Sequence, residues 1–271
     1  MSMNNKSLIA LDLDGTLLKD DKTISLKTKT YLKELEERGN LIVLCSGRAL
    51  RSASKYYLDI GLKVSPIIAY NGHYSTNFHD KKYEIVHKID KNTAKSLYSN
   101  LIDGLIISAM SENMHTIYLD KDDPSLFAFY EKDDLKVIEG PLDKTIDDDV
   151  FTFVMKVYKD QDKRNKIIKT VNNLHKDICV RFWEGDDYAE IYVKGITKAT
   201  TIELVAKEYN IPFDNIYVFG DADNDIQMLE MYKNSFVMKN GNSNLMSIAR
   251  YITKYTNEED GVYYELKRIF G

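Results

Sequence analysis

Cysteine is scarce in this sequence, and it has neither a long apolar run nor an excess of basic residues. Cys45 and Cys179 are the only two cysteines among 271 residues, and two thiols do not make a disulfide-stabilised framework. Their apolar neighbours predict buried, reduced side chains. No apolar stretch approaches the roughly 18 residues that a membrane-spanning helix needs.

The N-terminal residues also lack the features of a secretion signal. The stretch MSMNNKSLIA has neither a basic start nor an apolar h-region. The formal net charge is −5 and the pI is about 5.6, whereas a nucleic-acid-binding protein usually carries a basic footprint. We therefore expect a cytoplasmic protein that binds neither nucleic acid nor a membrane.

Strand and helix patterns alternate through the first part of the sequence. Residues 8–13 are apolar except for Asp12, and a helical pattern follows over residues 24–38. Residues 41–45 form a continuous apolar run, which is typical of a strand covered on both faces. A helix near 49–58 and a strand from residue 66 complete a βαβαβ pattern, which predicts a parallel sheet.

Beyond residue 72 the βα rhythm is lost, and it returns only near residue 195. A hairpin pattern covers residues 73–88, and short strand candidates alternate irregularly with helix candidates at 91–102, 125–131 and 162–174. This middle block predicts an α+β insertion with an antiparallel sheet. The returning pattern predicts helices at 195–210, 223–232, 242–252 and 259–270 and strands at 215–221 and 234–240.

The predicted fold class is therefore α/β. A doubly wound, Rossmann-like core with a parallel sheet comprises residues 1–80 and 191–271, and the α+β domain inserted into it comprises residues 81–190.

Chemistry-bearing side chains follow the predicted core strands at their carboxyl ends, where open α/β sheets bind their ligands. The segments LDLDGT, LCSGR, GITK and FGDADND all fall at this edge. Together they contribute the candidate site residues Asp12, Asp14, Thr16, Ser46, Gly47, Lys198, Asp221, Asn224 and Asp225.

The aspartates Asp12, Asp14 and Asp221 need a compensating cation. Two unit charges about 4 Å apart repel by roughly 4 kcal/mol at an effective dielectric of 20. An all-oxygen site suits Mg²⁺, while Lys198 adds a fixed positive charge and Ser46 adds a donor beside exposed backbone N–H groups. Such a set suits a phosphoryl group. One carboxylate free to attack, with another near the leaving group, fits a covalent aspartyl-phosphate route.

The same segments resemble the motifs of a known family. DLDGTLL is similar to the D-x-D-G-T signature of the haloacid dehalogenase superfamily, LCSGR to its second motif, ITK to its third and GDADNDIQML to its fourth. AYNG and DGVYYELKRIF resemble the Cof-type subfamily, whose members carry a large type IIB cap. The resemblance covers nearly the whole core, while the insertion matches a cap by position and size alone.

This resemblance implies a role for each matched residue. Asp12 would be the nucleophile that carries the phosphoryl group, and Asp14 would protonate the leaving alkoxide and then deprotonate the attacking water. Mg²⁺ would be held by the side chains of Asp12 and Asp221 and by the backbone carbonyl of Asp14. Asp225 would orient Lys198 or a metal-bound water. The substrate and its phosphate would contact Thr16, Ser46, Gly47, Lys198 and Asn224.

The departures from the family pattern are small. Ser46 stands where Thr is commoner, and Ala199 replaces a frequent Gly, but neither change removes a catalytic group. Asp14 favours phosphate chemistry, because the dehalogenases proper lack this second aspartate. DADND is not an EF-hand loop, since Ile226 stands at the position that requires Gly.

We therefore expect a Mg²⁺-dependent phosphatase of small phosphorylated metabolites, sugar phosphates above all. A phosphomutase and a non-catalytic, phosphoryl-responsive binding module are the open alternatives. Arg48 could support the phosphate loop or form a structural ion pair, and Asn71 could be a turn residue or touch the substrate. The sequence does not determine the oligomeric state.

Overall fold

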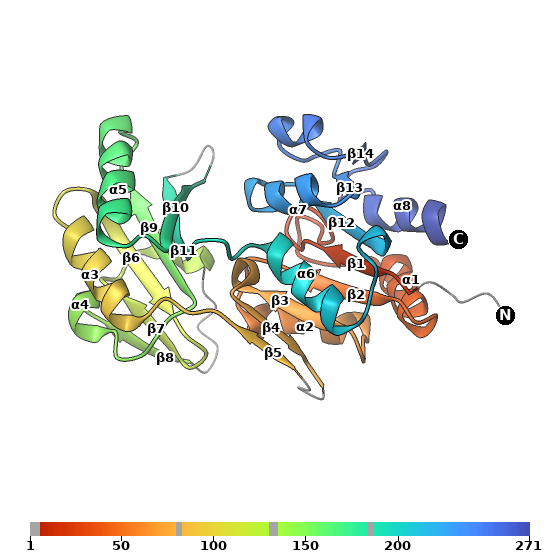
Figure 1. The fold of residues 1–271 in the computed structure, drawn as a ribbon, viewed down its shortest axis with the longest axis horizontal. Helices are drawn as coiled ribbons and strands as arrows, with labels where there is room; N and C mark the ends of the chain where they lie inside the picture. Colours follow the sequence, from red (N-terminus) through yellow and green to blue (C-terminus); the bar gives the residue numbers. More distant parts are fainter. Residues whose placement is uncertain (1–5, 80–82, 130–134, 184–186) are drawn as a thin grey trace. The chain divides into compact units, whose positions relative to one another are not determined.

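The computed structural model describes residues 6–79, 83–129, 135–183 and 187–271 (Figure 1). Its internal contacts divide the chain into two compact units. The core unit comprises Met1–Val86 and Thr197–Gly271, and the inserted unit comprises His87–Ile196. The predicted insertion, residues 81–190, begins and ends a few residues earlier than the inserted unit.

Within the described residues, the core unit contains an eight-stranded sheet in the order β14-β13-β12-β1-β2-β3-β4-β5. The pairs from β14 to β3 are parallel, and β4 and β5 add an antiparallel edge. The strands are β1 (Leu8–Leu11), β2 (Leu41–Cys45), β3 (Pro66–Ala69), β4 (Tyr74–Asn77), β5 (Glu84–Val86), β12 (Ile216–Gly220), β13 (Asn234–Val237) and β14 (Tyr251–Ile252).

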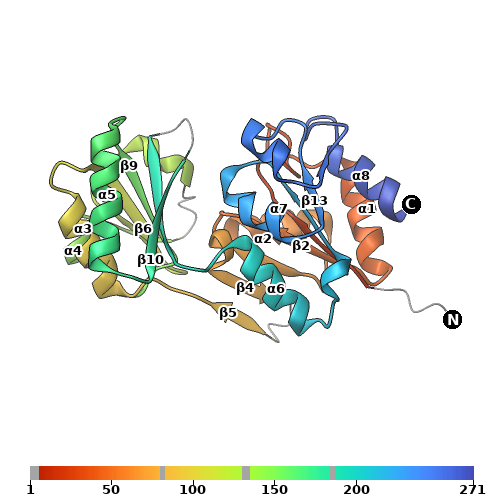
Figure 2. The same ribbon diagram turned by 45° about the horizontal axis from the view of Figure 1, so that its top comes forward.

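Helices cover both faces of this sheet, which explains the continuous apolar runs of its central strands (Figure 2). Ile9 and Leu11 of β1 pack on the side of α1, α2 and α8, whereas Leu8 and Ala10 pack on the side of α6 and α7. The core helices are α1 (Leu26–Glu37), α2 (Leu50–Ile60), α6 (Lys198–Glu208), α7 (Ile226–Met231) and α8 (Gly261–Phe270).

The strand order reverses direction at β1. The chain proceeds from β1 to β2 and β3 on one side and returns through β12, β13 and β14 on the other. In open α/β sheets, ligands bind beyond the carboxyl ends of the strands at such a switch point. The segments after β1 and β12 therefore meet at the expected position of a site.

The inserted unit contains a six-stranded sheet among its described residues, in the order β10-β11-β9-β6-β7-β8. Its pairs are antiparallel except for β7 with β8. The strands are β6 (Ile106–Glu112), β7 (Thr116–Leu119), β8 (Lys136–Glu139), β9 (Thr152–Val157), β10 (Ile178–Phe182) and β11 (Tyr188–Val193). The helices are α3 (Lys91–Leu101), α4 (Leu142–Thr145) and α5 (Gln161–Leu174). The predicted fold class is confirmed.

One predicted helix is wrong, and another is a 3₁₀ helix. Residues 242–252 form a 3₁₀ turn, Ser243–Ser247, followed by β14. Tyr251 pairs with Phe236 of β13 and stacks on its ring, so sheet pairing overrides the local helical pattern. Residues 125–131 contribute to a 3₁₀ helix, Pro124–Phe129, whose first turn is held by the Asp123 side chain. Residues 130–131 lie outside the described residues.

The helix predicted from residue 223 begins later than expected. Asp223–Asp225 form a 3₁₀ turn before α7, because the Asp225 side chain accepts backbone N–H groups from the preceding turn. The burial predicted for both cysteines holds for Cys45 only. Cys179 is partly exposed because β10 is an edge strand of its sheet.

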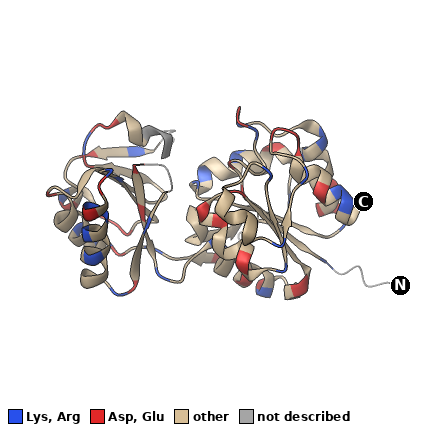
Figure 3. Ribbon diagram, turned by 90° about the horizontal axis from the view of Figure 1, so that it is seen from above, with Lys and Arg blue, Asp and Glu red and all other residues tan. Residues whose placement is uncertain are grey.

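Basic and acidic residues are interspersed on the helices of both units (Figure 3). Among the described residues, none of the helices combines the length and the apolar character that crossing a lipid bilayer requires. The predictions about nucleic acid, membrane and cellular location stay predictions.

Candidate active site

The carboxyl end of β1 leads directly into a tight turn. The backbone N–H of Asp12 donates to the carbonyl of Phe219 at 3.1 Å, which continues the ladder between β1 and β12 by one residue. Gly15 then adopts a φ of 77°, in the region that favours glycine. A methyl group at Gly15 would lie 2.2 Å from Asp221 Oδ2, so the turn approaches Asp221 more closely than a side chain allows.

Lys198 joins this turn to the segment after β12. The helix α6 begins at Lys198 and is capped by Thr197, whose hydroxyl accepts the N–H of Thr200. The Lys198 side chain is 1% exposed, and its Nζ donates to Asp12 Oδ1 at 2.5 Å and to Asp225 Oδ1 at 2.7 Å. One buried ammonium group therefore bridges two buried carboxylates.

Asp225 is fixed by both of its oxygens. Oδ1 accepts from Lys198, while Oδ2 accepts the backbone N–H groups of Asp221 at 2.9 Å and Ala222 at 3.1 Å. A methyl group at Gly220 would lie 2.5 Å from Asp225 Cγ, which explains the glycine at the end of β12. The FGDADND segment thus wraps around the carboxylate of its own last residue.

The acids in this cluster carry more charge than Lys198 neutralises. Burial raises the pKa of Asp12 well above its usual value; Lys198 lowers it, and Asp225 and Asp221 add to the rise. Burial and the nearby Asp225 raise the pKa of Asp221 to about 7. Burial alone would lower the pKa of Lys198, but Asp12 and Asp225 outweigh that effect and raise it. The cluster is therefore electrostatically suited to an additional cation.

The donor set fits a hard divalent cation. Asp12, Asp221 and Asp225 each offer an oxygen, and the three atoms lie within 4.8 Å of one another. Both oxygens of Asp225 already accept hydrogen bonds, so Asp225 is better placed to position Lys198 than to bind a metal ion. Asp12 and Asp221 are the carboxylates that could hold the ion, because all-oxygen sets are those that hard cations select.

Asp14 lies outside this buried cluster and has cationic partners of its own. Arg48 Nε donates to Oδ2 at 2.6 Å and Arg48 Nη2 donates to Oδ1 at 2.8 Å. Lys22 Nζ donates to Oδ1 at 2.8 Å. Burial opposes the ionised form, but the hydrogen bonds from Arg48 and Lys22 outweigh it and lower the pKa of Asp14 to about 2. Arg48 thus pairs with the predicted acid and base.

The LCSGR segment follows β2 and contributes a second group of site residues. The hydroxyl of Ser46 accepts the N–H of Arg48 at 3.1 Å, and the backbone carbonyl of Ser46 accepts the N–H of Asn71 at 3.0 Å. A methyl group at Gly47 would lie 3.0 Å from Asn71 Oδ1. Asn224 Nδ2 donates to the same Oδ1 at 3.0 Å. Asn71 therefore connects Gly47 with Asn224.

The candidate site residues of the sequence analysis fall into these connected groups. Asp12, Lys198 and Asp225 form the ion-paired centre, and Thr16 Oγ1 donates to Asp221 Oδ1 at 2.7 Å. Ser46 and Gly47 are linked through Asn71 to Asn224. Their catalytic and binding roles stay predictions.

Comparison with known proteins identifies the family. The family model described as haloacid dehalogenase-like hydrolase matches residues 9–266. The chain belongs to the haloacid dehalogenase-like hydrolases. It is 33% identical over 267 residues to the 5-amino-6-(5-phospho-D-ribitylamino)uracil phosphatase YitU of Bacillus subtilis, with 97% of each chain covered. It is 26% identical to the Mycoplasma genitalium protein named putative phosphatase MG265, over 97% of this chain and 98% of that one.

Solved structures of haloacid dehalogenase-like hydrolases share the fold. One from Bacteroides thetaiotaomicron superposes with a TM-score of 0.81 at 24% identity and covers 98% of this chain and 100% of its own. The subclass IIB sugar phosphatase BT4131 gives a TM-score of 0.80 at 17% identity, over 97% of this chain and 99% of that one. The predicted superfamily and Cof-type subfamily are confirmed, as is the predicted class of phosphoric monoester hydrolase.

Two features of this hydrolase escaped the sequence reasoning. An ion pair of Arg48 was one of two open alternatives, but its pairing with Asp14 was not foreseen, although an arginine directly after Ser-Gly at a strand end was the available signal. Lys22 was not singled out, because its distance from Asp14 depends on the path of the loop after Leu18.

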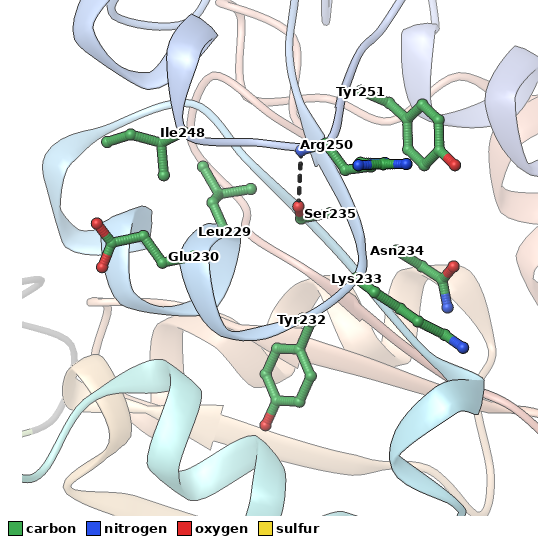
Figure 4. Close-up of a pocket in the computed structure, with 9 residues that line it drawn as sticks. All are labelled: Leu229, Glu230, Tyr232, Lys233, Asn234, Ser235, Ile248, Arg250 and Tyr251. Carbon is green, nitrogen blue, oxygen red and sulfur yellow. Dashed lines mark hydrogen bonds between the residues drawn. The ribbon is translucent and has the colours of Figure 1, made fainter.

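A separate depression of about 460 Å³ lies at the amino ends of β13 and β14 (Figure 4). Lys233, Asn234, Arg250 and Tyr251 are among its lining residues. The predicted site residues follow the carboxyl ends of the strands, so this depression and the candidate site lie at opposite ends of the strands.

Proposed function

We propose that this chain is a Mg²⁺-dependent phosphatase that hydrolyses small phosphorylated metabolites through a phosphoaspartate on Asp12. The observation that carries the proposal is the buried pairing of Asp12 with Lys198 beside Asp221 at the switch point of the sheet. A lysine held at 1% exposure by two carboxylates supplies fixed positive charge where a dianionic phosphate would sit.

The ion would be held by Asp12, by Asp221 and by the backbone carbonyl of Asp14. When bound, it neutralises carboxylate charge and draws the substrate's phosphate toward the nucleophile. Lys198 holds Oδ1 of Asp12 and so limits the orientations that this side chain can adopt. Asp225 fixes Lys198 in turn, because both of its own oxygens are hydrogen-bonded.

Two displacements at phosphorus would complete the reaction. Hydrogen bonds from Arg48 and Lys22 keep Asp14 ionised, so Asp14 takes up one proton from solvent before the first step. In that step a carboxylate oxygen of Asp12 bonds to phosphorus, the ester P–O bond breaks, and Asp14 gives this proton to the departing alkoxide. In the second, a water oxygen bonds to phosphorus, its proton passes to Asp14, and the bond between phosphorus and Asp12 breaks. Free phosphate leaves, Asp14 releases its proton to solvent, and both aspartates return to their ionised starting state.

The substrate class follows from the site and from the relatives. The hydroxyl of Ser46, the backbone at Gly47 and the amide of Asn224 offer the donors that a phosphate ester requires, whereas the hydroxyl of Thr16 already donates to Asp221. YitU and YwtE of Bacillus subtilis are both named as phosphatases of 5-amino-6-(5-phospho-D-ribitylamino)uracil. We propose phosphate esters of sugars and sugar alcohols as the substrate class, with this ribityl phosphate as one candidate.

The test is a panel of such esters with purified protein, with and without Mg²⁺, scored by kcat/KM and by product. We expect release of free phosphate that depends on Mg²⁺ and is lost in Asp12→Asn, which keeps the size of the side chain and removes its charge. An isomeric sugar phosphate as the product would identify a phosphomutase instead. A long-lived phosphoaspartate without turnover would identify a phosphoryl-responsive module. Full activity in Asp12→Asn would contradict the proposal.

A further inference from the structure

The contact between Arg48 and Asp14 has the geometry of a bracket. Two nitrogens of one guanidinium group donate to the two oxygens of one carboxylate, at 2.6 and 2.8 Å. A planar fork of this kind defines both the position and the plane of the carboxylate, which a single ammonium group does not. Lys22 makes only one contact with Asp14, and its side chain is 53% exposed, compared with 23% for Arg48.

Arg48 is itself held on several sides. Its backbone N–H donates to Ser46 Oγ, and its carbonyl accepts the N–H of Tyr70. Its third nitrogen, Nη1, donates to Ser52 Oγ at 3.0 Å, and its guanidinium lies 5.5 Å from the ring centre of Tyr56. Ser52 and Tyr56 are four residues apart on α2 and so share one face of that helix. The guanidinium group of Arg48 is therefore held in place by side chains of a helix.

These contacts place fewer donors on one oxygen of Asp14 than on the other. Oδ1 accepts from Arg48 and from Lys22, whereas Oδ2 accepts from Arg48 alone among the described residues. A carboxylate has about four acceptor positions, two on each oxygen. The position that remains is on Oδ2. The side chain of Asp14 as a whole is 42% exposed.

We propose that Arg48 is a positioning residue that orients Asp14 so that Oδ2 exchanges the proton with the leaving oxygen. The inference rests on the proposed function, because it assigns Arg48 a part in that reaction. A proton donor must come within about 2.6–3.2 Å of its target. Without the fork, the partly exposed Asp14 side chain can occupy other staggered rotamers, which take Oδ2 away from that position.

The test uses two kinds of ester that differ in their need for a proton. The anion of p-nitrophenol is stable and leaves without protonation, whereas the alkoxide of a sugar or glycerol phosphate must be protonated. The parameter is kcat/KM, which reports the steps up to departure of the leaving group. The hydrolysis of phosphoaspartate, common to both esters, then does not contribute.

We expect Arg48→Ala to lower kcat/KM for the alkyl ester at least about 10-fold more than for p-nitrophenyl phosphate. This is part of the roughly 10²–10⁴-fold that a general acid contributes. We call the ratio of the two losses in kcat/KM the discrimination. Asp14→Asn, measured in parallel, gives the discrimination that results when the general acid is removed completely. Arg48→Lys keeps the charge but cannot contact both oxygens, so we expect it to keep more than half of the discrimination of Arg48→Ala on a logarithmic scale.

Matched variants separate positioning from charge and from folding. Arg38→Ala removes an arginine that pairs with Glu34 at the end of α1, and we expect it to leave the ratio of the two substrates unchanged. Ser52→Ala removes the contact to Nη1 without touching Asp14. We expect it to change the ratio in the same direction by a smaller factor, and it tests the positioning role even if Arg48→Ala does not fold.

The outcomes distinguish this inference from the proposed function. If the unaltered protein hydrolyses neither ester, the proposed function fails. If it hydrolyses both and Arg48→Ala and Ser52→Ala lower the two values of kcat/KM equally, only the positioning role is overturned. Full rescue by Arg48→Lys, or a loss of equal size in Lys22→Ala, would also overturn it, because charge alone would then suffice.

Discussion

Replacing Lys198 by methionine should destabilise the core unit and leave the inserted unit unchanged. Lys198 Nζ lies 2.5 Å from Asp12 Oδ1 and 2.7 Å from Asp225 Oδ1. At an effective dielectric of 20, each contact corresponds to a gross attraction of about 6 kcal/mol. Desolvation of the buried charges offsets much of this attraction. We therefore expect a loss of about 3–5 kcal/mol, the usual result when one partner of a buried ion pair is removed.

The same cluster predicts a different result for Asp12→Asn. This change removes one of the crowded acids, and Lys198 keeps Asp225 as its partner. Burial and the neighbouring acids raise the pKa of Asp12, which means that its charge is unfavourable in the metal-free protein. We expect Asp12→Asn to be at least as stable as the unaltered protein when no divalent cation is present. If packing alone mattered, both substitutions would lower stability. If electrostatic repulsion among the acids matters, only Lys198→Met should do so.

The assay is equilibrium unfolding in urea with a chelator present, followed by circular dichroism. Because the chain has two compact units, the curves should be fitted with one transition for each unit. The transition of the inserted unit serves as an internal control. A loss below about 1 kcal/mol for Lys198→Met, or an equal loss in Asp12→Asn, would refute this electrostatic account.

Three further predictions concern the turn at Gly15, the metal and the inserted unit. Gly15→Ala should lower stability and abolish activity, because a methyl group would meet Asp221 Oδ2 at 2.2 Å. The control is Gly39→Ala, where φ is similarly positive but no atom lies within 4 Å of the added methyl group. This control should lose only the roughly 1–3 kcal/mol of stability that backbone strain costs, and it should stay active. Mg²⁺ added after chelation should restore activity and raise the unfolding midpoint by mass action, and Asp221→Asn should lose that rise. Burial opposes ionisation of Asp123, but hydrogen bonds from Ser108 and Ser125 outweigh it and lower its pKa to about 2. Its stabilising contribution should therefore be complete above about pH 5 and should fall toward pH 2, where Asp123→Asn and the unaltered inserted unit should converge in urea titrations.

The core of the site was predictable because it follows from strand polarity. Once residues 8–11 and 216–220 are assigned as neighbouring parallel strands, Asp12 and Asp221 must emerge at the same edge. Lys198 could be added because a helix that leads into a parallel strand begins beside the carboxyl ends of the strands, and Lys198 is the first residue of α6. These inferences need only the alternation of strand and helix and the position of polar residues within it.

The partners of Asp14 were not predictable in the same way. The ion pair with Arg48 depends on the path of the loop between β2 and α2, and the contact with Lys22 depends on a loop residue with a φ of 64°. Neither is encoded in a periodic pattern. The wrong helix at 242–252 has a related cause, since the stacking of Tyr251 on Phe236 is a tertiary contact that local propensity does not contain.

Trapping the phosphorylated enzyme tests the central claim most directly. The unaltered protein is mixed with a labelled phosphate ester and Mg²⁺, quenched in acid within a single turnover, and digested for peptide mapping. We predict that the label appears on the peptide containing Asp12, decays with the release of phosphate, and is absent from Asp12→Asn. Turnover without any labelled peptide, or a label on another residue, would contradict the proposed route.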